Sequence, residues 1–278
     1  MLLQVRRVNV VGMAGYALLL ACTAVMLLPL FWMFSTSVKP LADVFSLPVE
    51  WWPAAPEWNN FVSAWNQYPF ARYFLNSTLT GAAITVINVL FSGFAGYALA
   101  KFEFFGKHAV FLAILSTLML PIEVLMVPTF LIVKDLGWLN TYQALIIPSA
   151  ASAFGVFLMR QTLLHLPDSL IEAARIDGAS EPRIFLQIVV PLVWPSLLTL
   201  ALLEFRESWD SFLWPLIVTS QADMRTVAVG LSMFQQQNVT RFNELMAMSS
   251  VAMLPMLVLF FFFQRAFIQG IASTGLKE

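Results

Sequence analysis

The sequence contains a charge-free apolar run, VNVVGMAGYALLLACTAVMLLPLFWMFSTSV, from Val8 to Val38. Arg6 and Arg7 directly precede it. About 20 apolar residues are enough for a helix to cross the hydrocarbon layer of a bilayer. The run is too long for the apolar core of a signal peptide, and no convincing small-residue cleavage site follows it. We therefore predict a retained first transmembrane span.

The composition of the whole chain agrees with a membrane location. Of its 278 residues, 59% are hydrophobic and 11% are charged, whereas soluble domains carry about 45–50% apolar and about 25% charged residues. The formal net charge of -1 provides no general attraction for nucleic acid. The single cysteine, Cys22, allows neither an intrachain disulfide nor a metal-binding cysteine cluster. The composition predicts an integral membrane protein that does not bind nucleic acid.

Long apolar runs recur along the chain, and a backbone inside a bilayer must satisfy its own hydrogen bonds, which favours helices. We predict an all-α integral membrane fold with six transmembrane helices in a single domain covering residues 1–278. The spans lie at about 9–36, 73–100, 108–133, 140–163, 184–218 and 244–268. Because proline lacks an N–H donor, helices should bend or end at the prolines within these runs. These are Pro29, Pro121, Pro128, Pro148, Pro191, Pro195, Pro215 and Pro255.

Basic residues are divided unequally between the two sets of loops. Cytoplasmic loops carry an excess of Lys and Arg, and six spans place both termini on one side. The N-terminal side holds Arg6, Arg7, Lys101, Lys107, Arg160, Arg175, Arg183, Arg265 and Lys277, and the other side holds only Lys39, Arg72, Lys134, Arg225 and Arg241. Both termini are therefore predicted to be cytoplasmic. The outer segment 40–72 carries Trp51, Trp52, Trp58 and Trp65, which is typical of short pieces at headgroup level.

A short charged stretch, EAARIDGASEPRIFLQIVVPL, runs from Glu172 to Leu192 between two apolar spans. Pro167 and Asp168 suit the first turn of a helix. Gly178 favours the left-handed conformation just past a helix end, and Ser180 can cap the next helix. The pattern predicts a helix, a sharp turn and a second helix. From physics alone, an ordinary solvated connector explains it as well as a docking surface does.

The string Glu172-Ala173-Ala174, followed by Gly178 and later by Ile188 and Pro191-Leu192, resembles the EAA loop of ABC importer permeases. In that family the loop docks in a cleft of the cytoplasmic ATPase subunit. Nearly the whole chain resembles the second permease subunit of the carbohydrate-uptake group, of the maltose and glycerol-phosphate importer type. Further similarity lies in Leu120-Pro121, in residues 157–160 and in residues 209–216. Asp210 departs from the asparagine that relatives often carry.

The resemblance implies a type I ABC importer permease fold with cytoplasmic EAA coupling helices. It implies that the chain is not an enzyme and itself binds no cofactor, with ATP and Mg held by the partner ATPase. The chain has no glycine-rich phosphate loop ending in Gly-Lys-Ser/Thr. The implied partners are a second permease subunit in a heterodimer, two ATPase subunits, an extracytoplasmic solute-binding protein and membrane lipid. The implied location is the inner membrane of a prokaryotic cell.

The same resemblance assigns roles to three segments. A coupling loop at about 164–183 would contact the ATPase through Glu172, Ala173, Ala174, Asp177 and Gly178. An outer loop at about 219–243 resembles the loop that probes the ligand cleft of the binding protein, although a flexible connector also explains it. A cytoplasmic tail at 270–278 resembles a tail that reaches between the ATPase subunits, whereas its physics alone predicts a frayed terminus.

A cluster of charges lies in the outer half of the predicted fifth span. Charged side chains inside a membrane usually face a cavity or a partner because exposure to lipid is costly. One interpretation is a substrate pathway of Glu123, Glu207, Trp209 and Asp210, in which carboxylates bind sugar hydroxyls and the indole stacks on a sugar ring. The other is an internal salt-bridge set that includes Glu204 and Arg206.

Other functions are consistent with fewer of these features. A proton-coupled secondary transporter could use the same carboxylates but has no need of an ATPase-docking loop. An intramembrane hydrolase lacks a GxSxG elbow or a paired metal motif here. His108 and His165 have no nearby ligand partners in the sequence, so we predict no metal site. The expected solute is a sugar or oligosaccharide, with a glycerol phosphate or its diester as the alternative.

Overall fold

The computed structural model describes residues 10–235 and 240–275. Arg6, Arg7, Lys277, residues 236–238 of the polar outer run and the last three residues of the predicted tail lie outside these ranges. Apart from one isolated β-bridge between Gln235 and Thr240, the regular structure within the ranges is helical. The elements are α1 Val10–Ser37, η1 Leu41–Asp43, α2 Asn59–Gln67, α3 Phe70–Lys101, α4 Lys107–Thr117, α5 Ile122–Asp135, α6 Tyr142–Ile146, η2 Ile147–Ser149, α7 Ala153–Leu164, α8 Asp168–Ile176, α9 Glu181–Ile184, the π-helix η3 Phe185–Val189, α10 Val190–Leu192, α11 Trp194–Asp210, α12 Leu213–Val218, η4 Ala222–Met224, α13 Val227–Ser232 and α14 Phe242–Gly275.

The predicted all-α fold is confirmed, and the helices account for up to six spans. Three single helices are long and apolar enough to cross a membrane: Gly15–Ser37, Phe70–Lys101 and Phe242–Gln264. Three bent pairs bring the number to six if each pair forms one span. The pairs bend by 95° between α4 and α5, by 43° between the α6–η2 segment and α7, and by 83° between the Glu181–Leu192 segment and α11.

Three predicted spans therefore bend or break, as the prolines led us to expect, and the 140–163 run bends by 43° just after Pro148. The 108–133 run breaks before Pro121, and the 184–218 run breaks at Val193 and again at Ser211. Pro121, Pro191 and Pro195 lie at or beside the bends, where each removes a backbone donor. Helix α14 also continues beyond the predicted end at residue 268 and includes the first residues of the predicted tail.

Three of the prolines expected to bend or end helices lie inside helices that continue past them. They are Pro29 in α1, Pro128 in α5 and Pro255 in α14. Transmembrane helices tolerate proline because neighbouring groups and small local adjustments satisfy the freed carbonyl. The presence of proline alone therefore did not locate the breaks.

The chain groups into two compact units, Met1–Tyr68 with Leu231–Met253, and Pro69–Gly230 with Leu254–Glu278. In the first unit, buried amide groups tie the end of α1 to later segments. Asn60 donates from Nδ2 to the carbonyls of Ser37 (3.0 Å) and Lys39 (2.9 Å), and Asn243 donates to Lys39 (3.3 Å). The tryptophan-rich segment packs on the same helix end, where Trp51 contacts Trp32 edge-on at 5.7 Å.

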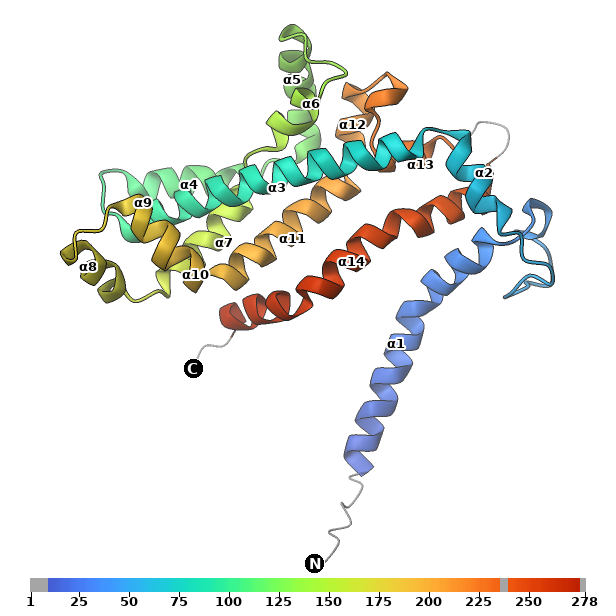
Figure 1. Cartoon of the computed structure of the whole chain (residues 1–278), viewed down its shortest axis with the longest axis horizontal. Coiled ribbons are helices and arrows are strands. Elements are labelled where there is room, and N and C mark those ends of the chain that lie inside the picture. The colour runs from blue at the N-terminus through green and yellow to red at the C-terminus, as the bar shows by residue number, and fades with distance from the viewer. Residues whose placement is uncertain (1–9, 236–239, 276–278) are drawn as a thin grey trace, which may run out of the picture. The chain divides into compact units, whose positions relative to one another are not determined.

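The second unit is organised around α3, which packs along α7 and α11 (Figure 1). Glycine allows the closest approach between α3 and α7. A Cβ on Gly96 would lie 2.7 Å from the Cβ of Met159 and 2.9 Å from the backbone nitrogen of Arg160. Small residues at such crossings let membrane helices pack backbone to backbone, which replaces the hydrophobic driving force that lipid does not supply.

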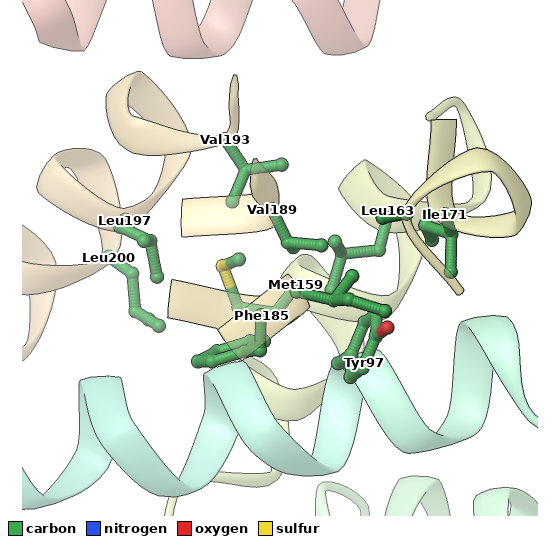
Figure 2. Packing of buried hydrophobic residues seen from close by; sticks show 11 residues of the cluster. Tyr97, Met159, Leu163, Ile171, Phe185, Val189, Val193, Leu197 and Leu200 are labelled. Atoms are coloured by element: carbon green, nitrogen blue, oxygen red, sulfur yellow. The ribbon is translucent and has the colours of Figure 1, made fainter. Parts of the chain in front are cut away.

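One buried cluster joins these long helices to the short helix α8. Figure 2 shows Met159 and Leu163 of α7, Phe185 and Val189 of η3 and Ile171 of α8 in one group with Tyr97 of α3, which lies at the edge of the group. Ala174 of α8 belongs to the same cluster. The helix outside the apolar spans is therefore packed against α3 and α7 and is not a loosely attached connector.

Candidate functional site

The predicted helix, turn and helix of the coupling loop are confirmed. Pro167 occupies the N-cap position and Asp168 begins α8. After the helix, the N–H groups of Asp177, Gly178 and Ala179 donate to carbonyls of the last turn at 3.0 Å each. Gly178 has a φ of 79°, the left-handed conformation that glycine adopts without a steric penalty. In one detail the prediction was wrong, because Ser180 precedes α9 without a side-chain capping bond.

Helix α8 has one buried side and one open side. Ile171 and Ala174 are buried in this chain's own cluster, whereas Glu172, Ala173 and Asp177 are exposed. Ile176, in the last turn of the helix, is 86% exposed. Sequence reasoning missed Ile176, although its place directly before Asp177-Gly178 on the open side was visible in the helical spacing. The open side therefore offers carboxylates, a small residue and an apolar side chain together.

Side chains from α3 fix the beginning of α8. The Lys101 ammonium donates to the Leu166 carbonyl (2.5 Å) and to Asp168 Oδ1 (2.6 Å), with only 4% of the Lys101 side chain exposed. The hydrogen bond from Lys101, together with its charge, lowers the pKa of the Asp168 carboxyl below its usual value. Asp168 therefore remains ionised and paired at neutral pH.

A second set of polar contacts fixes the end of α8. Arg175 Nε donates to Glu181 Oε1 at 2.6 Å, and the Tyr97 hydroxyl donates to Glu181 Oε2 at 2.9 Å. The Arg175 guanidinium also lies 5.5 Å from the ring centroid of Phe102. The hydrogen bond to Glu181 raises the pKa of the Arg175 guanidinium. One carboxylate thus links α8 to α3, and the sequence pattern had not indicated Tyr97, Lys101 or Glu181 as partners.

The acidic region of α11 lines a cavity of about 480 Å³. Its lining residues are Phe154, Leu203, Glu204, Arg206, Glu207, Asp210 and Ser211. Of the four residues predicted for the substrate pathway, the structure brings Glu207 and Asp210 together here. Glu123 is exposed in the first turn of α5 and is not among the lining residues.

Trp209 points into the protein instead. It is only 5% exposed and packs against Phe74 and Phe205, with ring centroids 5.8 Å and 5.7 Å away. The helical spacing explains this, because Glu207 and Asp210 are three residues apart on one face while Trp209 falls on another. Its indole is therefore part of the aromatic packing between α3 and α11.

The charges of the cavity are only partly compensated within the chain. Arg206 pairs with Asp210 (3.3 Å), and both side chains are more than half exposed. Glu204 is buried and accepts a hydrogen bond of 2.8 Å from Asn88 Nδ2, which also donates to the Ser149 carbonyl at 3.0 Å. The exposed carboxylates of Glu207 and Asp210 therefore outnumber the single guanidinium of Arg206, and such a site disfavours anions. The internal interpretation therefore holds for Glu204 and for the Arg206–Asp210 pair, whereas the substrate pathway through the exposed Glu207 stays a prediction.

The first part of the predicted outer loop is held by asparagines. Asn140 Oδ1 accepts from the backbone N–H groups of Ser220 (2.7 Å) and Gln221 (2.8 Å). Asn76 Nδ2 donates to the carbonyls of Asp223 (2.7 Å) and Arg225 (2.9 Å). The segment 219–226 is thus an ordered turn and not a free connector. Among the described residues, no group of three His, Cys, Asp or Glu side chains could hold a metal ion.

Comparisons with known proteins identify relatives of the chain. Residues 88–273 match the family described as "Binding-protein-dependent transport system inner membrane component". The chain is 42% identical over 205 residues to the arabinooligosaccharides transport system permease protein AraQ of Halalkalibacterium halodurans, covering 74% of each chain. It is 34% identical over 254 residues to AraQ of Bacillus subtilis, covering 90% of each.

Other relatives differ in the solute named for them. The sn-glycerol-3-phosphate transport system permease protein UgpE of Yersinia pestis is 35% identical over 267 residues, covering 93% of this chain and 95% of that one. A solved structure of a bacterial ABC transporter involved in import of the acidic polysaccharide alginate has a TM-score of 0.82 and 23% identity, covering 96% of this chain and 100% of that one. At this identity the likeness concerns the fold alone.

Proposed function

The chain belongs to the family of binding-protein-dependent transport system inner membrane components, and we propose that it is the membrane-spanning permease subunit of an ATP-driven importer for a sugar or oligosaccharide. The observation that carries this proposal is the 34% identity to AraQ of Bacillus subtilis over 90% of both chains. The exposed side of α8 supports it, because a subunit powered by another chain needs a preformed contact surface.

The proposed ATPase contact is the open side of α8. Glu172 and Asp177 offer charges for a basic group of the ATPase, Ala173 permits close approach, and Ile176 offers an apolar contact. Gly178 sets the turn that presents this side. Ala174 is not part of the contact surface but supports α8 from its buried side, since it packs in this chain's own cluster. ATP and Mg belong to two ATPase subunits, and this chain catalyses no reaction.

The remaining partners follow from the same family. A second permease subunit would complete the pathway, and an extracytoplasmic solute-binding protein would deliver the solute to the outer loop. The chain lies in the inner membrane, and we propose that both termini are cytoplasmic. This orientation requires the α8 segment and the outer loop to lie at opposite ends of α3, and within the second unit Lys101 contacts the α8 segment while Arg72, at the other end of α3, donates to the Asp223 carbonyl (3.2 Å).

The cavity favours a neutral solute. Carboxylates such as Glu207 and Asp210 accept hydrogen bonds from sugar hydroxyls, whereas a phosphate would meet these two exposed carboxylates and one guanidinium. A glycerol phosphate remains the second candidate because of the 35% identity to UgpE. For that solute, the second permease subunit would have to supply positive charge. Alternating access would open the cavity first to one side and then to the other.

Purification tests the proposal. The tagged chain is extracted gently from its native membrane, and the proteins that accompany it are identified by mass spectrometry. We expect a second permease subunit and an ATPase, and a binding protein whose affinity is then measured for sugars and for glycerol phosphates. A chain that purifies alone and carries solute into liposomes without ATP, in a manner abolished by a protonophore, would instead be a secondary transporter.

A further inference from the structure

Helix α3 differs from its neighbours because it is a single, unbroken element. It runs through 32 residues without a proline, whereas the three bent pairs around it turn by 43° to 95°. At about 1.5 Å per residue its length is about 48 Å, which exceeds the roughly 40–45 Å of a bilayer with its headgroups. Helix α3 is therefore long enough for both of its ends to lie outside the hydrocarbon layer of a bilayer.

One end of α3 holds both ends of α8. Lys101 binds Leu166 and Asp168 at the beginning of α8, and Tyr97 reaches the end of α8 through Glu181 and Arg175. Because the Lys101 side chain is almost fully buried, its two oxygen partners replace the water that it has lost. A displacement of α8 would therefore have to break these bonds or move the end of α3 with it.

The other end of α3 holds the outer segment 219–227. Asn76 is completely buried, bonds the carbonyls of Asp223 and Arg225, and accepts a hydrogen bond from the Tyr142 hydroxyl at 2.7 Å. Ser77 Oγ accepts from the backbone N–H of Val227 at 2.9 Å. The attachment is therefore made to the backbone of the outer segment, so that it constrains the path of the segment and not merely one side chain.

We propose that α3 passes a displacement of α8 to the outer segment 219–227, with Lys101 and Asn76 as positioning residues at its two ends. This inference rests on the proposed docking of α8 to an ATPase. Coupling between distant sites is carried by packed, rigid elements with two arrangements, and it must be demonstrated by measurement. A continuous helix bonded at both ends supplies the rigid element, and the labelling experiment below tests whether it takes two arrangements.

The experiment uses the whole complex purified with this chain. Replacing the single cysteine by Cys22→Ser gives a background without thiols in this chain. Gln221→Cys then places one reporter on the exposed outer segment, and Ser169→Cys places another on exposed α8 in a separate protein. The rate of N-ethylmaleimide labelling of each is measured by mass spectrometry with and without a non-hydrolysable ATP analogue.

We expect the ATP analogue to change both labelling rates by about fivefold or more, as in typical allosteric coupling. Lys101→Met should reduce the change at Gln221→Cys and preserve it at Ser169→Cys, because only the Tyr97–Glu181–Arg175 attachment then remains, and Lys101→Arg should restore it. Lys107→Met is the matched control, since Lys107 pairs with Glu103 at 2.9 Å near the same end of α3. It should leave both responses intact. Ser77→Ala should weaken only the outer response.

The outcomes separate this inference from the proposed function. If Ser169→Cys responds to the analogue while Gln221→Cys does not, the outer segment is not coupled and the inference fails alone. It also fails alone if the response of Gln221→Cys in the Lys101→Met protein is as large as in the protein with Lys101. If neither reporter responds in an intact complex, the docking of α8 itself is contradicted, and the inference falls with it.

Discussion

The coupling loop around α8 and the acidic cavity beside α11 are both charged, but they hold their charges differently. In the loop, Asp168, Arg175 and Glu181 are all paired within the chain. The exposed residues belong to α8, whose other side is packed in the buried cluster. In the cavity, Arg206 makes one exposed ion pair and Glu207 is left open. The fixed charges of the loop are thus satisfied within the chain and its open side is the ATPase contact that we propose, whereas Glu207 in the cavity is exposed.

The largest expected effect concerns the open side of the loop. Glu172→Ala removes the proposed ionic contact with the ATPase, and truncating one partner of such a pair costs about 2–5 kcal/mol, equivalent to about 30-fold or more. We expect ATP hydrolysis to become uncoupled from transport while the amount of chain in the membrane is unchanged. Transport and ATPase rates are measured in proteoliposomes. Glu103→Ala, at a highly exposed carboxylate, is the control, and wild-type transport by Glu172→Ala would contradict the proposed contact.

The next effect tests the cavity. Glu207→Gln combined with Asp210→Asn removes two ionised acceptors, and each hydrogen bond to a charged group is worth about 1.5–3 kcal/mol. For a neutral sugar we expect solute uptake to fall by about tenfold or more, with ATP-dependent labelling of α8 unchanged. Uptake of radiolabelled sugars and of glycerol phosphate is compared. An increase in glycerol phosphate uptake would instead identify the anion as the solute, because the variant lowers the repulsion.

A smaller effect is expected at the turn after α8. Gly178→Ala places a Cβ in the left-handed conformation, which costs about 1–2 kcal/mol even though nothing lies within 4 Å of the added atom. The turn should weaken and the affinity for the ATPase should decrease, with little change in the spans. Binding is followed by the ATPase retained on the tagged chain. Gly15→Ala, in α1 with open space around it, is the matched control.

The smallest effect concerns the pair of Lys101 and Asp168. The pKa of Asp168 is lowered by folding, so its stabilising contribution is present above the unfolded pKa and is lost as the pH falls through the folded value. Asp168→Asn should therefore lower the thermal unfolding temperature slightly at pH 7. The difference from wild type should shrink below about pH 4. A difference that is constant from pH 7 to pH 3 would show that the charge has no part in it.

How much of these two regions could be predicted depends on how far apart in the sequence the interacting residues lie. The path of the coupling loop depends on neighbours in sequence, such as Pro167, Asp168 and Gly178, so it was predictable. The bonds that hold it come from Tyr97 and Lys101, far away in sequence, and no local pattern indicates them. The six apolar runs likewise predicted the spans, but the bends depend on tertiary packing as well as on proline.

The cavity shows the same limit of prediction from local sequence patterns. The one-face spacing of Glu207 and Asp210 was visible, yet only tertiary structure showed Trp209 packed against Phe74 and Phe205. Glu123 belongs to a pair of helices bent by 95°, and an apolar run does not reveal such a bend. Nor does the sequence show that Ala174 is buried in this chain's own cluster while Ala173 is exposed.

The most direct test of the central claim is a cross-linking measurement at α8. A photoreactive amino acid replaces Ile176, the exposed apolar residue of the open side, and in a second protein replaces the buried Ile171. Irradiation of the native membrane is followed by mass spectrometry of the cross-linked products. The account predicts an ATPase subunit cross-linked from position 176 and not from position 171. An intact complex that yields no ATPase cross-link from position 176 would contradict it.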